Sequence, residues 1–87
     1  MIQKPLIHLN GTSRLSLREQ YKTAASDVAR ASQSLVEAAP NQRDYYPLGN
    51  EAWEAARDEH HARMKFLEMV MEDLTALYEH TYEGEKT

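Results

Sequence analysis

The chain of 87 residues has no cysteine, three glycines, three prolines, one phenylalanine and one tryptophan. Without cysteine it can form neither disulfides nor thiolate metal sites, and four histidines without thiolate partners argue against a structural zinc. A chain this short buries only about 60–65 % of the surface that its unfolded form exposes. We therefore expect a marginal core in one copy, stabilised by association with further copies.

Long apolar runs are missing too. No stretch approaches the roughly 20 consecutive apolar residues that a membrane-spanning helix needs. The N-terminal residues lack the basic start and apolar segment of a secretory signal peptide. We therefore expect a soluble, cytoplasmic protein without a membrane partner.

A strongly basic surface is also absent, since 14 acidic residues outnumber 10 basic ones and the formal net charge is −4. Proteins that bind DNA or RNA present a face rich in lysine and arginine, so we expect no polymeric nucleic acid as a partner. The basic residues are nevertheless concentrated in the first 50 residues, and the rest of the chain carries the acidic excess. A small anionic partner would therefore meet the first half of the chain.

What is present is helical periodicity. Apolar residues recur in alternating steps of four and three, which is typical of a helix packed nearly antiparallel against another helix. The members are Leu17, Tyr21, Ala24, Val28, Ala31, Leu35 and Ala38. The helix should end at Ala39, because Pro40 disfavours the α conformation in the residue before it.

A second helix is predicted to follow Asn50, which is a good N-cap. Its apolar positions lie within an arc of about 80°, with His60 on the same line; they are Trp53, Ala56, Met64, Leu67, Met71, Leu74 and Tyr78. A neighbouring row, formed by Phe66, Val70 and Leu77, would be exposed in a single hairpin. We therefore predict that this row is an oligomer interface.

Together these patterns predict an all-α fold, a single domain over residues 1–87. It is an antiparallel two-helix hairpin, with helices at about 13–39 and 51–80 joined by a loop at 40–50. Residues 1–12 form an extended arm that lies on the hairpin or on a neighbour, and residues 81–87 form a frayed tail. The assembly should be a homo-oligomer, either a dimer or a higher even number of chains.

The segment "HLNGTS", residues 8–13, is a turn-forming cluster before the first helix. Glycosylation at Asn10 would require secretion, and a β-hairpin turn would require a strand on each side. One remaining interpretation is a helix cap, in which Thr12 or Ser13 accepts the first N–H groups and Gly11 allows a positive φ just before the helix. A capping box of Ser16 with Glu19 would start the helix three residues later.

The other interpretation of this segment is a pocket for an anion. Gly11 would let the backbone approach a phosphate closely, and the hydroxyls of Thr12 and Ser13 would contact it together with the first N–H groups. Arg14 would supply the positive charge, and Asn10 would add a polar contact. A cap in the free state and an anion site in a complex are compatible.

The loop contains a second unusual segment, Arg43, Asp44, Tyr45 and Tyr46. In one interpretation the tyrosines cover the hairpin end, and Arg43 and Asp44 pair with each other or cap a carbonyl. In the other, the tyrosines stack on a base, Arg43 binds a phosphate and Asp44 accepts from a base edge or ribose hydroxyl. In one hairpin this segment lies about 40 Å from Arg14, so a shared pocket requires a second chain.

Metal and catalytic chemistry are disfavoured. His60 points to the apolar seam and His61 lies about 100° away, so the two cannot chelate one ion. We expect a buried, hydrogen-bonded His60 and a solvated His61, with no metal and no cofactor. No pairing of a nucleophile with a base follows a recognisable motif, so we do not expect an enzyme.

Three segments, "PLIHLNGTS", "AAPNQRDYYP" and "EHHARMKFLEMVMEDLTAL", together resemble a family of short proteins encoded by tailed phages and prophages. The resemblance covers Pro5 to His80, implies a phage protein acting in the host cytoplasm, and brings no assigned chemistry. The general plan is similar to small phage proteins that oligomerise and sequester a cyclic oligonucleotide or cyclic ADP-ribose signal, as anti-CBASS and anti-Thoeris sponges do. This second likeness is one of architecture.

The leading hypothesis is accordingly a non-enzymatic phage protein that binds a small anionic, nucleotide-like ligand between subunits, as a sponge for a bacterial immune signal. The alternative is a protein–protein interaction module, either a phage structural or assembly component or a direct inhibitor of a host protein.

Overall fold

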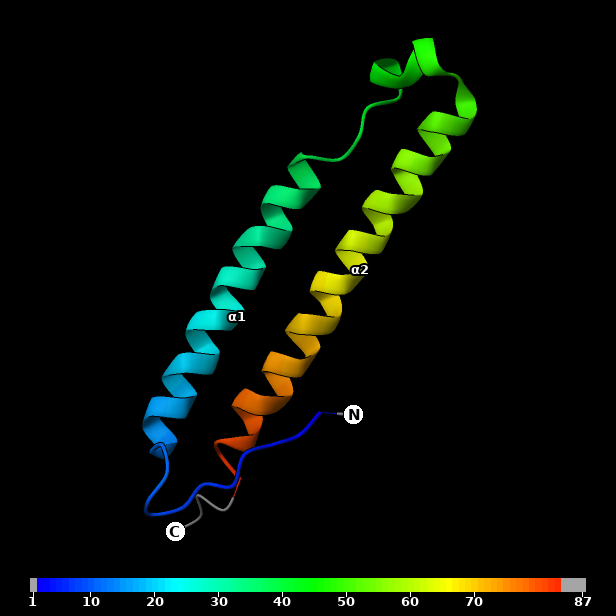
Figure 1. Ribbon diagram of the computed structural model, residues 1–87. Helices are drawn as coiled ribbons and strands as arrows, with labels where there is room; N and C mark the ends of the chain where they lie inside the picture. The colour runs from blue at the N-terminus through cyan, green and yellow to red at the C-terminus, as the bar shows by residue number, and fades with distance from the viewer. Residues whose placement is uncertain (1, 84–87) are drawn as a thin grey trace.

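The computed structural model describes residues 2–83, which form three helices and no strand: α1 (Arg14–Glu37), η1 (Gln42–Leu48) and α2 (Asn50–His80). The predicted all-α class is confirmed. α1 and α2 lie side by side and run in opposite directions, with η1 at one end of the pair and the N-terminal arm at the other (Figure 1). The molecule is elongated, with extents of 63 × 22 × 21 Å.

α1 begins where a side-chain cap is available. Ser13 has an extended backbone (φ −65°, ψ 154°), and its Oγ accepts the N–H of Ser16 at 3.1 Å. This settles the start of the helix in favour of Ser13 over a capping box beginning at Ser16. The positive φ that glycine would allow at Gly11 is not used, because Gly49 has the only positive φ among residues 2–83.

The other end of α1 comes two residues earlier than predicted. The helix stops at Glu37, and the N–H of Ala38 bonds to the carbonyls of Ser34 and Leu35, both at 3.1 Å. Pro40 disfavours the α conformation at Ala39, the residue before it. The bond from Ala38 to Leu35 spans three residues, so the last turn is already tighter than an α-helical turn.

The connection is more ordered than a loop at 40–50. η1 is a 3₁₀ helix whose N-cap Asn41 accepts the N–H of Arg43 through Oδ1 at 3.0 Å. The Tyr45 ring packs against Trp53 at the start of α2, with 6.1 Å between ring centroids. These local contacts hold the connection on α2, whereas the prolines and the glycine suggested only irregular structure.

α2 is capped differently from the prediction. Asn50 is its first residue, and Gly49 occupies the N-cap position with no side-chain hydrogen bond. Gly49 has φ 93° and ψ 172°, a conformation that only glycine adopts without strain. Its N–H closes η1 on the carbonyls of Tyr45 and Tyr46 at 3.2 and 3.3 Å. The chain therefore turns from η1 into α2 through backbone freedom.

The seam between α1 and α2 follows most of the predicted positions, but Ala31 and Ala38 are exposed, whereas Ala25 and Ser32 on the neighbouring side of α1 are half-buried. Most members of both apolar rows are half-buried, and His60 is 6 % exposed. However, no hydrophobic side chain in residues 2–83 is buried. Two helices meet along one line, so each seam residue stays open to solvent on at least one side.

The arm first crosses the end of α2 and then turns once before α1 (Figure 1). The turn is closed by a hydrogen bond from the N–H of Gly11 to the carbonyl of His8 at 3.2 Å. Nearer the N-terminus, the Pro5 carbonyl lies 2.8 Å from His80 Nε2. The arm therefore lies on its own chain, one of the two placements predicted for it.

The residues predicted to fray after His80 are ordered as far as the structure describes them. Thr81 is fully buried, and the N–H groups of Thr81, Tyr82 and Glu83 bond to carbonyls of the last turn at 3.0–3.1 Å. Polar contacts hold this segment, together with the edge-on packing of the Tyr82 ring on Tyr78, whose ring centroids lie 5.4 Å apart. The remainder of the predicted tail lies outside the described residues.

Replacing Gly49 by alanine should destabilise the fold by about 1–3 kcal/mol. The new Cβ would meet no atom within 4 Å, so the loss comes from the positive φ, which is strained for a residue with a side chain. Thermal unfolding at equal protein concentration measures this. Gly11→Ala is the matched control. Its Cβ would meet only the exposed His8 ring, at 2.7 Å, so we expect a change within about 0.5 kcal/mol. Equal losses of stability in both variants would contradict the conclusion that the backbone conformation at position 49 requires glycine.

Candidate functional site

The segment before α1 is exposed, with Asn10, Gly11, Thr12 and Ser13 all on the surface. The Ser13 hydroxyl already accepts a helix N–H, so as an anion site the segment would keep the side chains of Asn10 and Thr12 and the remaining N–H groups of the first turn. The arrangement is that of a capped helix start with two polar side chains beside it.

Arg14 turns away from that segment toward the end of α2. Its Nη1 donates to the Thr81 carbonyl at 2.6 Å and to the Glu83 carbonyl at 2.9 Å. These carbonyls lie at the negative end of the α2 dipole, which a cation stabilises. The structure therefore uses the guanidinium predicted for a phosphate as a cap for the neighbouring helix.

Arg18 adds to the same cap. Its Nη2 donates to the Thr81 carbonyl at 3.1 Å, its Nε donates to Thr81 Oγ1 at 3.2 Å, and its guanidinium carbon lies 3.6 Å from the centroid of the Tyr82 ring. Thr81 Oγ1 in turn donates to the Tyr78 carbonyl at 2.6 Å. We call this set the closing cluster: Arg14, Arg18, Tyr78, Thr81 and Tyr82.

His80 extends the closing cluster to the arm. Its Nε2 lies 2.8 Å from the Pro5 carbonyl and its Nδ1 lies 3.0 Å from Glu83 Oε2. Both neighbours of the ring are hydrogen-bond acceptors. The arm, the start of α1 and the end of α2 are therefore joined by polar contacts.

A sequence signal for this cluster existed. Arginines near the start of a helix oppose the positive end of its own dipole, as Arg14 and Arg18 do in α1. In an antiparallel pair, however, the start of one helix lies beside the negative end of the other. The unfavourable position of two arginines thus indicated that they serve the partner helix.

The second predicted segment forms the far end of the molecule in η1. Tyr45 packs on Trp53 and is half-buried, whereas Tyr46 is 70 % exposed. Arg43 and Asp44 are exposed, and within residues 2–83 their side chains make no hydrogen bond or ion pair. An unpaired guanidinium and an open aromatic ring therefore share the tip.

The structure does not bring the two predicted segments together. The 24 residues of α1 separate them, about 36 Å of helix, and they lie at opposite ends of the pair (Figure 1). In a single chain, Arg14 and Arg43 cannot contact one small ligand.

The histidines of α2 are placed on the predicted faces. His60 is buried and His61 is exposed. The predicted hydrogen bond of His60 is wrong for Nε2, which has no partner among residues 2–83. Its seam neighbours Ala56 and Met64 offer no strong acceptor. Within residues 2–83, no group of three histidines or carboxylates could hold a metal ion.

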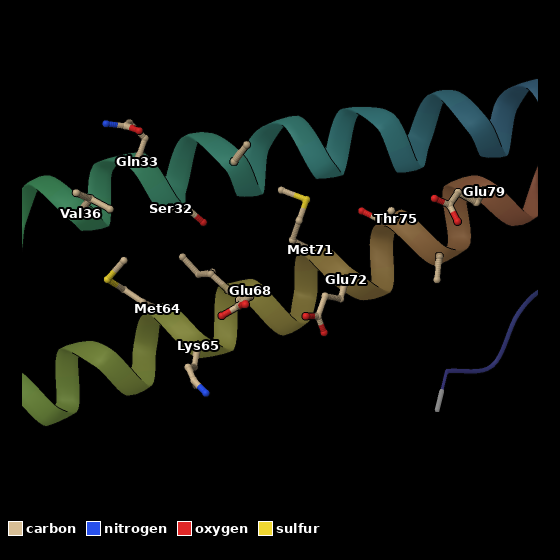
Figure 2. A pocket seen from close by; sticks show the side chains of 13 residues that line it. Ser32, Gln33, Val36, Met64, Lys65, Glu68, Met71, Glu72, Thr75 and Glu79 are labelled. Carbon is tan, nitrogen blue, oxygen red and sulfur yellow. The ribbon is translucent and has the colours of Figure 1, made fainter.

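One face of the helix pair carries an open groove of about 860 Å³. In Figure 2, Met71 points across toward α1, while Lys65 and Glu72 point outward from α2. A second hollow of about 560 Å³ continues the groove along Lys22, Ala25 and Ser26. The floor is apolar and the rim is charged, as on a surface that a further helix could cover.

The predicted interface row is partly open. Phe66 is 67 % exposed and Val70 is 42 % exposed, whereas Leu77 is half-buried. Residues two apart on a helix point about 160° away from each other, so Phe66 and Glu68 lie on nearly opposite sides of α2. Because Glu68 lines the groove, the row and the groove belong to different faces of the molecule.

No protein-family model, curated protein or solved structure matches the chain. Among the described residues, no helix is long and apolar enough to cross a membrane.

Thr81→Val should destabilise the protein by about 1–3 kcal/mol, because it removes the acceptor for Arg18 Nε from a fully buried position at nearly constant volume. Denaturant or thermal unfolding measures this loss. Thr23→Val is the control, since Thr23 is exposed on α1 and should change stability by no more than about 0.5 kcal/mol. If the two variants have the same stability, the closing cluster does not stabilise the open end of the helix pair, where α1 begins and α2 ends.

Proposed function

We propose that this chain is a non-enzymatic protein–protein interaction module, a helical hairpin that associates with further copies of itself. The observation that carries the proposal is that no hydrophobic side chain of residues 2–83 is buried in one chain. Small domains without disulfides or metal commonly gain stability from oligomerisation. A second copy would supply the burial that one layer of two helices lacks.

The contact surface in this proposal is the row of Phe66, Val70 and Leu77. Phe66 alone leaves two thirds of its surface in water. Aromatic side chains are enriched at the centres of interfaces, where they remove a large area from water. The half-buried Leu77 would extend the contact toward the arm.

The resemblance to short phage proteins supports the proposed biological setting. In this proposal the chain is a phage or prophage protein in the host cytoplasm and acts as a structural or assembly component or as a direct inhibitor of a host protein. The grooves of the helix pair are open and shallow, which suits the docking of another surface better than the enclosure of a substrate.

Phe66→Glu should lower the molar mass measured by light scattering at tens of micromolar. The charge is harmless on an exposed helix position but cannot be buried in an apolar contact without a large cost. Met69→Glu is the matched control, because Met69 is 59 % exposed and lies on the side of α2 away from α1. The proposal fails if the wild-type protein has the mass of one chain, 10.0 kDa.

A second candidate function is favoured by the tip. There, Arg43 has no partner among residues 2–83 and the Tyr46 ring is largely open. A guanidinium beside an aromatic face suits the phosphate and base of a small nucleotide. This candidate is a ligand-binding protein that holds an anionic, nucleotide-like molecule between subunits, and it could thereby sequester a bacterial immune signal.

In this second candidate the tip of one chain meets the segment Asn10–Ser13 of another. The exposed side chains of Asn10 and Thr12 would add polar contacts, and Asp44 would accept from a base edge or ribose hydroxyl. Arg14 would contribute only by giving up its hydrogen bond to Thr81 or to Glu83. Tyr45 would stack only after leaving Trp53, so Tyr46 is the stronger choice.

A ligand of this class should raise the melting temperature at about 100 µM, since binding to the folded state at 100-fold its Kd adds about 2.7 kcal/mol. We would screen cyclic di- and trinucleotides and ADP-ribose derivatives. Arg43→Ala should abolish the shift. Arg30→Ala should retain it, because Arg30 is also an exposed arginine and its partner among residues 2–83 is Asp27 in mid-α1, far from the tip. The absence of any shift would exclude this second function.

A further inference from the structure

The chain exposes more surface than one interface would use. A folded monomer of 10.0 kDa exposes about 5,200 Å² by the size scaling of globular proteins. This chain exposes 6906 Å². The excess, about 1,700 Å², is roughly twice the 800 Å² that each partner contributes to a standard interface.

Exposed apolar side chains lie on two faces of the helix pair. The row of Phe66 and Val70 opens on one side of α2, and the groove opens on the other, where Ala29 on α1 lines both hollows. On the groove face, Met64, Leu67 and Met71 are half-buried and Val36 is 50 % exposed. Each face therefore has its own apolar strip.

The groove floor suits close approach by a helix. α1 contributes Ala25, Ala29 and Ser32, small side chains that let a neighbouring helix pack near its backbone, and α2 contributes two methionines, which adapt to an irregular surface. The chain itself offers helices of the right kind, since α1 is amphipathic and rich in alanine.

The charges of the two helices select the arrangement of a second copy. α1 carries four basic and three acidic side chains, whereas α2 carries three basic and eight acidic ones. If α2 lay on the partner's α2, Glu68 and Glu72 would face acidic side chains across the groove. If α1 lies over the partner's α2, Lys22 comes to the acidic rim, and the attraction favours this pairing.

We propose that the groove face is a second self-association surface, occupied by another copy of this chain with its α1 over the α2 of the first. The inference rests on the proposed self-association and extends it, because two separate faces on each chain build an assembly of more than two chains. Contacts repeated on two faces produce a closed ring or a stack, depending on whether the rotation closes.

The test measures molar mass by light scattering for four proteins: wild type, Phe66→Glu, Ala29→Glu and the double variant. Ala29 is exposed in one chain, and glutamate is a good helix former, so Ala29→Glu should fold. We expect more than two chains for the wild type, two for each single variant and one for the double variant. If circular dichroism shows lost helix in Ala29→Glu, Val36→Glu on the same face replaces it.

The outcomes separate the inference from the proposed function. A wild type of two chains that Ala29→Glu leaves intact overturns the inference and retains the interface at Phe66. A wild type of one chain overturns both. If Ala29→Glu lowers the mass and Phe66→Glu does not, the groove face stands and the interface at Phe66 falls.

The arrangement is tested by cross-linking, which is clean because the chain has no cysteine. Within one chain Arg18 is level with Thr81, so the antiparallel helices place Ala29 of α1 level with about residue 70 of α2, beside Glu68. When the partner's α1 lies over α2 in the same register, its Ala29 also comes beside Glu68. A mixture of Ala29→Cys and Glu68→Cys chains should form a disulfide-linked pair on oxidation. Cross-linking confined to Ala29→Cys chains with one another would place α1 on α1 and overturn the arrangement.

Discussion

Two helices in contact share a single line of packing, and this limit determines the rest of the structure. A side chain on that line is covered by one neighbouring helix and remains open above or below it. Even with an apolar seam along most of α2, only His60 and Thr81 are buried among residues 2–83, and neither is hydrophobic. The apolar seam sets the register of the helices, but it cannot by itself supply the burial that stabilises a globular domain.

Polar contacts compensate at the two ends, by different means. At the open end, Arg14 and Arg18 neutralise the carbonyls that finish α2, and they do so around a buried Thr81. At the other end, Asn41 caps η1 and the backbone of Gly49 redirects the chain. Charged hydrogen bonds to a helix terminus are stronger than neutral ones. The open end is therefore held by side chains and the tip mainly by backbone geometry.

This division explains what the sequence could predict. The two long helices and their seam follow from periodicity, because side chains on one face must recur every three or four residues. The details that failed depend on single hydrogen bonds. Asn41 and Gly49 impose a 3₁₀ helix and a glycine cap where residue types suggested an irregular loop and an Asn50 cap, and Thr81 is held by arginines 63 and 67 residues away. Only the opposition of Arg14 and Arg18 to their own helix dipole hinted at that pairing.

Because the two ends of the helix pair are held by different contacts, they differ in how readily each could bind an anion. Arg14 has a structural task, so any anion that recruits it competes with the Thr81 and Glu83 carbonyls and weakens the closure of the helix pair. Arg43 has no such task among residues 2–83, and η1 holds the backbone beneath it in place. A ligand that meets Arg43 therefore breaks no existing contact of that side chain, while the backbone is already ordered. If the protein binds an anionic ligand as in the second candidate function, the physical cost of binding favours the tip over the start of α1.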